Sequence, residues 1–231
     1  MNEATWHRIA ASGSWFASAP PALQQALLAC TTPRHQDDGA RLFSRGDAPD
    51  GLYAVVQGAV RITGLASDGR EALLAIVEPS QWFGEIGVLD GLPRTHDAHA
   101  QGATVVLHAP QAALLGLLGS QPALWQSIGL LATSKLRAAF QALEDMALLP
   151  AENRIAARLL AMSQGYDERT RQTRRVVRLS QEQLASMLAL SRQTVNQVLQ
   201  GLAQQGVVRP GRGMVEILDV QRLRALAGRT P

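Results

Sequence analysis

The stretch from residue 180 to residue 202 reads SQEQLASMLALSRQTVNQVLQGL and decides the fold of the C-terminal part of the chain. Its first residue, Ser180, precedes Gln183 by three positions, the spacing of a capping box that starts a helix. A second helix can begin after Ser191, whose hydroxyl suits an N-cap. The apolar positions recur at helical spacing on both sides of a turn at Ala189-Leu190: Leu184, Ala185 and Leu188, then Val195, Val198, Leu199 and Leu202. This pattern predicts a helix-turn-helix motif.

Polar side chains occupy the outer face of the second predicted helix, near its N-terminus. An arginine can bond O6 and N7 of guanine as a fork, and glutamine can pair with N6 and N7 of adenine. A solvated face on an ordinary helical hairpin is the alternative. The residues expected to contact DNA here are Ser180, Ser191, Arg192, Gln193, Thr194, Asn196 and Gln197.

The residues that follow the second predicted helix favour DNA binding over that alternative. Residues 207–217 read VVRPGRGMVEI, which predicts a β-hairpin wing. Arg209 and Arg212 would lie near its tip, where they could contact phosphate.

Charge is divided unevenly along the chain, whose 231 residues carry a formal net charge of +3. Residues 1–150 hold 9 basic and 13 acidic side chains, residues 151–170 balance, and residues 171–231 hold 10 basic and 3 acidic ones. The net charge is therefore −4 in the first part and +7 in the last. This asymmetry indicates an acidic body joined to a basic part that meets a polyanion, although a charged tail can also be merely solvated.

From Thr32 to His108 the pattern is typical of β-structure, with short apolar or alternating segments separated by turn residues. The clearest expected strands are residues 52–56, 59–63 and 104–108, with a turn at Gln57-Gly58 between the first two. The even spacing predicts a sandwich or barrel. Ahead of it, Pro21 to Cys30 is expected to form a short helix with Leu23, Leu27 and Leu28 inward.

After Pro110 helix formers dominate, predicting a short helix to about Leu118 and a long one from Pro122 to about Leu149. The long helix would span about 40 Å, more than a small β body needs for packing. Its apolar stripe could be ordinary core, but its length favours pairing with the same helix of a second subunit. The residues expected at that contact are Leu136, Phe140, Leu143 and Ala147.

A glycine-containing turn lies within the β region, where Phe83-Gly84-Glu85-Ile86-Gly87 is followed by Pro93-Arg94-Thr95. Free amides at a short helical turn, a guanidinium and a hydroxyl are groups that bind phosphate, and a carboxylate can accept from a sugar hydroxyl. Alone, this pattern is also typical of a structural turn beside a surface ion pair. The expected effector-binding residues are Gly84, Glu85, Ile86, Gly87, Arg94 and Thr95.

The order of parts resembles the cyclic-AMP receptor/fumarate-nitrate regulator (Crp/Fnr) superfamily of bacterial transcription regulators, over about residues 20–218. The segments that carry the resemblance are 83–85 with 93–95, 153–156 (NRIA) and 190–196 (LSRQTVN). It implies an α+β protein with a cyclic-nucleotide-binding-like β-roll, a long dimerisation helix and a C-terminal winged helix-turn-helix. We expect an N-terminal extension over residues 1–20, the effector-binding β-roll over 21–121, the dimerisation helix over 122–149 and the DNA-binding domain over 150–231.

The resemblance further implies a homodimer on a palindromic double-stranded DNA site, control by an effector, and contact with RNA polymerase. In the cyclic-AMP-responsive branch a threonine–serine pair on the long helix meets the adenine, and the equivalent positions here hold Ala139 and Phe140. We therefore expect a different cyclic nucleotide, such as cyclic GMP, or a cyclic dinucleotide. Ala189 also replaces a glycine common at the turn of the family's helix-turn-helix, which costs about 1 kcal/mol if that residue is left-handed.

Other functions are weighed by their chemistry. One cysteine, Cys30, cannot supply the iron–sulfur cluster of the oxygen-sensing branch. A haem-based regulator using His96, His99 or His108, a regulator that needs no ligand, and a ligand-binding module whose C-terminal hairpin docks protein stay open as alternatives.

No catalytic triad, metal-hydrolase or nucleotide-hydrolysing pattern occurs, so we expect neither an enzyme nor a metal site. No apolar run approaches the ~20 residues of a membrane helix, and the region before Cys30 lacks the apolar core of a signal peptide. We expect a cytoplasmic protein without a membrane partner.

Overall fold

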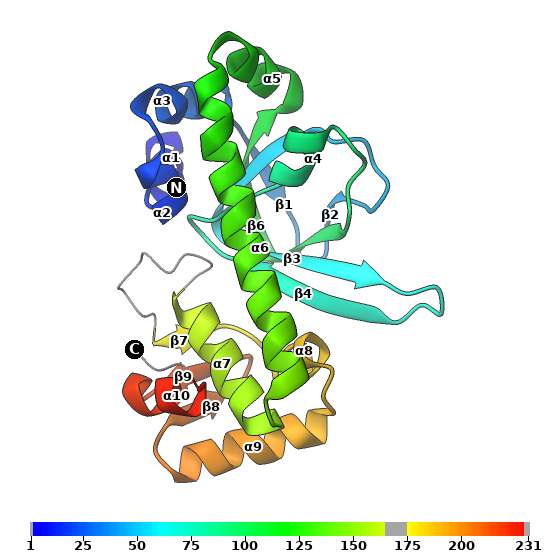
Figure 1. The fold of residues 1–231 in the computed structure, drawn as a ribbon, viewed down its shortest axis with the longest axis vertical. Coiled ribbons are helices and arrows are strands. Elements are labelled where there is room, and N and C mark those ends of the chain that lie inside the picture. The colour runs from blue at the N-terminus through cyan, green and yellow to red at the C-terminus, as the bar shows by residue number, and fades with distance from the viewer. Residues whose placement is uncertain (1, 165–174, 229–231) are drawn as a thin grey trace. The chain divides into compact units, whose positions relative to one another are not determined.

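A computed structural model describes residues 2–164 and 175–228 (Figure 1). The chain divides into two compact units, residues 1–133 and 134–231, and the boundary falls inside one long helix. Three of the basic residues counted in the C-terminal part, Arg171, Arg174 and Arg229, lie outside the described residues. Within the described part of the chain, no helix is both long and apolar enough to cross a membrane.

The first unit is built on an antiparallel sheet, which contains the β-structure expected between Thr32 and His108. Its strand order is β1-β6-β3-β4, with β2 paired to β6 and β5 paired to β3. The β3–β4 hairpin extends away from the other strands of this sheet (Figure 1). The strands are β1 (Thr32–Gln36), β2 (Arg41–Phe43), β3 (Gly51–Leu65), β4 (Glu71–Val77), β5 (Trp82–Phe83) and β6 (Asp97–Pro110).

The prediction of a turn at Gln57-Gly58 is wrong, because β3 runs without interruption from Gly51 to Leu65. The register between β3 and β6 shifts on both sides of Gln57, so the irregularity is a β-bulge inside one strand. Gly58 is needed there. Its φ is +71°, and a Cβ on it would lie 2.4 Å from the hydroxyl of Thr104.

Strand β3 has a buried face on each side, which explains its continuous apolar run. Tyr53 and Val55 belong to one core cluster, while Leu52, Ala54 and Val56 belong to the other. The second cluster is completed by helices α1 (Glu3–Ala11), α2 (Ser14–Ser18), α3 (Pro21–Cys30) and α5 (Gln111–Ser120).

The segment expected only as an N-terminal extension thus contains helices α1 and α2, whose side chains enter the core of the first unit. Phe16 of α2 is 1% exposed and stacks on Trp82 with ring centroids 5.3 Å apart. The predicted helix over residues 21–30 is confirmed, with Leu23 and Leu27 buried and Leu28 partly buried.

The long helix is confirmed as α6 (Trp125–Leu148), 24 residues preceded by a 3₁₀ turn η1 (Pro122–Leu124). Ile128 and Leu131, in the N-terminal part of its apolar stripe, are buried, as is Leu124 of η1 just before it. The C-terminal part is exposed: Leu136 by 53%, Phe140 by 63% and Leu143 by 61%.

The second unit contains the predicted helix-turn-helix and wing. Helix α7 (Ala151–Gln164) contributes buried apolar residues, and α10 (Val220–Leu226) ends against it, where the Asn153 amide donates to the Leu226 carbonyl at 2.8 Å. The motif is α8 (Gln181–Leu188) and α9 (Arg192–Gln204), and the wing is β8 (Val208–Gly211) and β9 (Met214–Ile217). A short strand, β7 (Val176–Val177), pairs with β9.

Both predicted caps and the strained turn are confirmed in this unit. Ser180 and Gln183 form the capping box of α8, and the Ser191 hydroxyl accepts from the Thr194 amide at 3.0 Å at the start of α9. Ala189, the C-cap residue of α8, has φ +50° and ψ +43°. It adopts the left-handed conformation although it is not glycine.

Candidate functional site

The glycine-containing turn of the first unit opens helix α4 (Glu85–Asp90). Gly84, its N-cap, is left-handed with φ +98°, and a Cβ there would lie 2.8 Å from the Gly51 carbonyl oxygen. A Cβ on Gly87 would lie 2.6 Å from Pro49. The two glycines therefore let the turn approach the loop before β3, and this close approach sets the geometry around Arg94.

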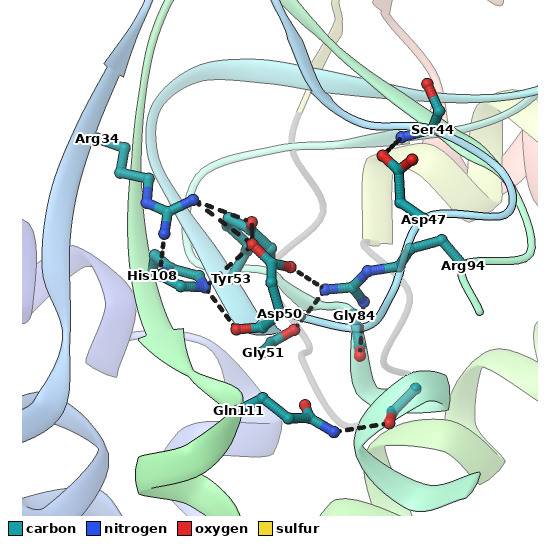
Figure 2. Close-up of polar contacts among 11 residues, drawn as sticks. Arg34, Ser44, Asp47, Asp50, Gly51, Tyr53, Gly84, Arg94, His108 and Gln111 are labelled. Carbon is teal, nitrogen blue, oxygen red and sulfur yellow. Dashed lines mark hydrogen bonds and ion pairs between the residues drawn. The ribbon is translucent and has the colours of Figure 1, made fainter. Parts of the chain in front are cut away.

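Arg94 is buried at the centre of this turn, with 5% exposure (Figure 2). Its Nη2 donates to Asp50 Oδ1 at 2.6 Å and to the Gly51 carbonyl at 2.8 Å, and its Nη1 donates to the Gly84 carbonyl at 3.0 Å. The guanidinium also lies over the Phe43 ring, 4.3 Å from its centroid. Its Nε is buried and has no hydrogen-bond partner among the described residues.

Asp50 supplies the counter-charge to Arg94. The Tyr53 hydroxyl donates to Asp50 Oδ2, and Arg34 Nη1 lies 3.6 Å from the same oxygen. Burial raises the pKa of Asp50, but the hydrogen bonds from Tyr53 and Arg94 and the charge of Arg94 outweigh it, leaving the pKa below its usual value. Burial and the bond to Asp50 raise the pKa of Tyr53. At neutral pH an ionised Asp50 therefore already neutralises much of the Arg94 charge.

His108 belongs to the same network rather than to an open ligand site. Arg34 Nη2 donates to His108 Nδ1 at 2.6 Å, and His108 Nε2 donates to the Asp50 carbonyl at 3.0 Å (Figure 2). Burial, followed by the charge of Arg34, lowers the pKa of His108, so its ring is neutral at pH 7. With both ring nitrogens engaged, His108 offers no lone pair to a haem iron. In the described residues, no group of three or more His, Cys, Asp or Glu side chains could hold a metal ion.

The other expected effector residues differ in their exposure. Glu85 is buried at the start of α4, whereas Ile86 is exposed. The Gly87 carbonyl accepts from the Gln111 side chain at 2.9 Å. Thr95 is exposed, and its hydroxyl lies 2.9 Å from His96 Nδ1. Among the predicted residues, Gly84 contacts Arg94 directly through its carbonyl, whereas the Gly87 carbonyl and the Thr95 hydroxyl contact Gln111 and His96 instead.

The second unit places the predicted DNA-contacting side chains on one exposed helix face. Arg192, Gln193, Asn196 and Gln197 are all exposed on α9, while Val195 and Leu199 on its opposite side are buried. Arg192 has no hydrogen-bond or ion-pair partner among the described residues. This arrangement leaves the N-terminal turns of α9 open to a ligand.

The two arginines of the wing differ. Arg209 Nη1 donates to Glu216 Oε2 at 2.8 Å across the β8–β9 pair, so part of its charge is neutralised within the wing. Arg212 is exposed in the turn between the strands. Arg212 is therefore the less constrained of the two for a phosphate contact.

Sequence reasoning missed one polar residue beside this face. Gln181, the first residue of α8, accepts a hydrogen bond from Asn196 Nδ2 of α9 at 3.1 Å. The two residues are 15 positions apart, so helical spacing gives no sign of their contact. Only the folded helix-turn-helix brings them together.

Comparisons with known proteins match both units. Residues 33–121 match the family described as "Cyclic nucleotide-binding domain", and residues 153–226 match the "Crp-like helix-turn-helix domain". These matches cover the turn that contains Arg94 and the helix-turn-helix. They define a class of protein in which a cyclic-nucleotide-binding-type β domain is combined with a DNA-binding helix-turn-helix.

Individual relatives align with this chain over most of their length. The chain is 31% identical over 216 residues to the "CRP-like cAMP-activated global transcriptional regulator" of Mycobacterium tuberculosis, covering 93% of this chain and 96% of the relative. It is 32% identical over 190 residues to the "Cyclic AMP receptor protein" of Thermus thermophilus, covering 82% and 85%. Among solved structures, FixK2 from Bradyrhizobium japonicum is 25% identical with a TM-score of 0.74, covering 85% of this chain and 96% of that one.

The chain belongs to the Crp/Fnr family of DNA-binding transcription regulators. This is a family of regulators and not of enzymes.

Proposed function

We propose that this protein is a sequence-specific transcription regulator whose DNA affinity is controlled by a cyclic nucleotide or cyclic dinucleotide bound at the turn that contains Arg94. The observation that carries this proposal is a buried arginine held against the first turn of α4 with its Nε–H unpaired. An anionic oxygen is the natural acceptor for such a donor. The effector-binding residues would be Gly84, Glu85, Ile86, Gly87, Arg94 and Thr95.

The relatives support a cyclic mononucleotide, since both curated names quoted above refer to cyclic AMP. Ala139 and Phe140, both exposed on α6, bring no hydroxyl to an adenine. Cyclic GMP and cyclic dinucleotides are therefore included with cyclic AMP as candidate effectors.

A regulator that needs no ligand is the second candidate, and Asp50 favours it. Its carboxylate already supplies Arg94 with a counter-charge at 2.6 Å, the role that an effector phosphate would otherwise have. Under this candidate the turn is a structural element, and DNA affinity does not depend on a small molecule.

Ligand titration separates the two candidates. The full chain is titrated with cyclic AMP, cyclic GMP and cyclic di-GMP, and both its melting temperature and its affinity for a selected DNA site are measured. A ligand at 100 times its Kd raises the free energy of unfolding by about 2.7 kcal/mol. Thr95→Val should weaken that ligand, and Thr32→Val, the same change at an exposed site on β1, should not. If no ligand changes either quantity, the second candidate replaces the first.

We also propose a homodimer formed through the second half of α6. The exposed stripe of Leu136, Phe140, Leu143 and Ala147 supports it, because the same stripe is buried further upstream and a soluble chain gains by covering such apolar area. Phe140→Glu should turn a dimer into a monomer in sedimentation. Gln141→Glu, the neighbouring exposed residue, should leave it dimeric.

The DNA interface proposed from this dimer consists of Ser180, Ser191, Arg192, Gln193, Thr194, Asn196, Gln197, Arg209 and Arg212. Two copies of α9 related by a twofold axis would contact half-sites about 34 Å apart, so the site should be palindromic. Contact with RNA polymerase and a cytoplasmic location, which the resemblance to the Crp/Fnr family implies, are part of the same proposal.

A further inference from the structure

The contact between Gln181 and Asn196 joins the two helices of the motif at the face proposed to meet DNA. Asn196 is exposed on α9, and its Nδ2 donates to Gln181 Oε1 at 3.1 Å. Gln181 lies in the first turn of α8, which the capping box between Ser180 and Gln183 holds in place through bonds of 2.8 and 3.1 Å. The acceptor for Asn196 is therefore presented from a fixed helix end.

The chemistry of the asparagine amide gives this bond a consequence. A free amide can present its oxygen and its nitrogen in either of two orientations, each with one acceptor and two N–H donors. Donation of one N–H to Gln181 directs the nitrogen toward α8 and so selects one orientation. The oxygen and the second N–H remain available.

One acceptor beside one donor is the pattern that pairs with adenine in the major groove, where N6 donates and N7 accepts. The bond to Gln181 removes neither group from this pattern. It also reduces the freedom that the Asn196 side chain would otherwise lose on binding.

We propose that Gln181 is a positioning residue that orients the Asn196 amide for recognition of adenine. The inference rests on the proposed function, because it assumes that α9 contacts bases. A surface hydrogen bond without this role would affect stability slightly and base preference not at all. Base preference at a single position is therefore the readout.

The test selects bound duplexes from a random library with the full chain and then measures relative affinity for each base at every position of the enriched site. The wild type should prefer adenine at one position of each half-site by roughly 5- to 150-fold. Asn196→Ala should abolish that preference. Gln181→Met, which keeps length but removes the acceptor, should lose most of it at the same position only.

Three further variants make the result specific. Gln181→Glu keeps an acceptor for Asn196, so it should retain the adenine preference while its charge weakens binding to all sequences alike. Gln200→Met makes the same change at an exposed site farther along α9 and should leave the preference intact. The double variant of Gln181→Met with Asn196→Ala should lose no more preference than Asn196→Ala alone.

Two outcomes overturn the inference while leaving the proposed function intact. One is a Gln181→Met protein with the full adenine preference, and the other is an Asn196→Ala protein with an unchanged motif. If the wild type enriches no motif, the proposed sequence-specific function fails, and the inference fails with it.

Discussion

Arg94 in the first unit and Arg192 in the second differ in burial and in their bonding partners. The sequence predicts an anion-binding role for Arg94 and a base-reading role for Arg192. Arg94 is 5% exposed and has its charge matched by Asp50 and its Nη atoms bonded to carbonyls. Arg192 is exposed, without a partner among the described residues. Arg94 therefore stabilises the fold, whereas the Arg192 side chain is solvated and free to contact a ligand.

The two arginines therefore have to be probed in different ways. A substitution at Arg94 changes stability and ligand binding together, so loss of a response there does not by itself identify a ligand contact. A substitution at the exposed Arg192 should leave stability nearly unchanged, so any change in DNA affinity there reports on binding.

Arg94→Ala should have the largest effect on stability, lowering the free energy of unfolding by about 3 kcal/mol. It breaks a buried ion pair and leaves the Gly51 and Gly84 carbonyls without their donor. The estimate is at the low end for a buried pair, because the Asp50 side chain is 42% exposed and can be hydrated. Denaturant unfolding measures it. Stability equal to the wild type would show that the Asp50–Arg94 bond is not formed in solution.

Arg192→Ala should change stability by less than about 0.5 kcal/mol, since the side chain is exposed and unpartnered. Its affinity for the preferred DNA site should fall by about 1–3 kcal/mol, with preference relaxed at one base position. Competition binding against single-base variants of the site measures both. A uniform loss over all sequences would mean that Arg192 contacts phosphate and not a base.

Ala189→Gly should stabilise the second unit by up to about 1 kcal/mol. Alanine pays a steric cost in the left-handed conformation that glycine avoids, partly offset by the greater freedom of glycine in the unfolded chain. Ala185→Gly, inside α8, should instead destabilise by at least about 1 kcal/mol. Thermal unfolding of both variants tests the prediction, and a lower melting temperature for Ala189→Gly would contradict it.

The smallest effect is a pH dependence that involves the Arg94 network. His108 has a lowered pKa in the folded state, because burial and the Arg34 charge disfavour its protonated form. As the pH falls below about 6.5, His108 binds a proton in the unfolded chain but not in the folded chain, so the free energy of unfolding decreases. His108→Gln should flatten this decline between pH 7 and the folded pKa. An unchanged slope in that variant would assign the decline to other groups, such as His96, whose pKa is lowered by burial and by Arg45.

The local features that depend on near neighbours in sequence were predictable. The capping box at Ser180, the helix over residues 21–30 and the long α6 follow from spacing and from caps, which act within one or two turns. The β-bulge at Gly58 was mistaken for a turn because a glycine with positive φ serves both, and only the pairing with β6 distinguishes them.

Contacts between distant residues were not predictable. Asp50 lies 44 positions from Arg94, and Gln181 lies 15 positions from Asn196, so neither pair leaves a periodic signal. Helices α1 and α2 leave no such signal either, because the contacts that bring them into the core join distant residues: Trp15 and Phe16 of α2 pack on Trp82, and the Ala10 carbonyl of α1 accepts from the Trp82 indole. Each of these contacts is made by the tertiary fold.

Sequence-specific DNA binding by a dimer is tested by measuring the affinity of the full chain for a selected symmetric duplex and for a shuffled duplex, over a range of salt concentrations. We expect preferred binding to two half-sites about one helical turn apart, with affinity for both duplexes falling steeply as salt increases. Equal affinity for the two duplexes, or affinity that does not depend on salt, would contradict it.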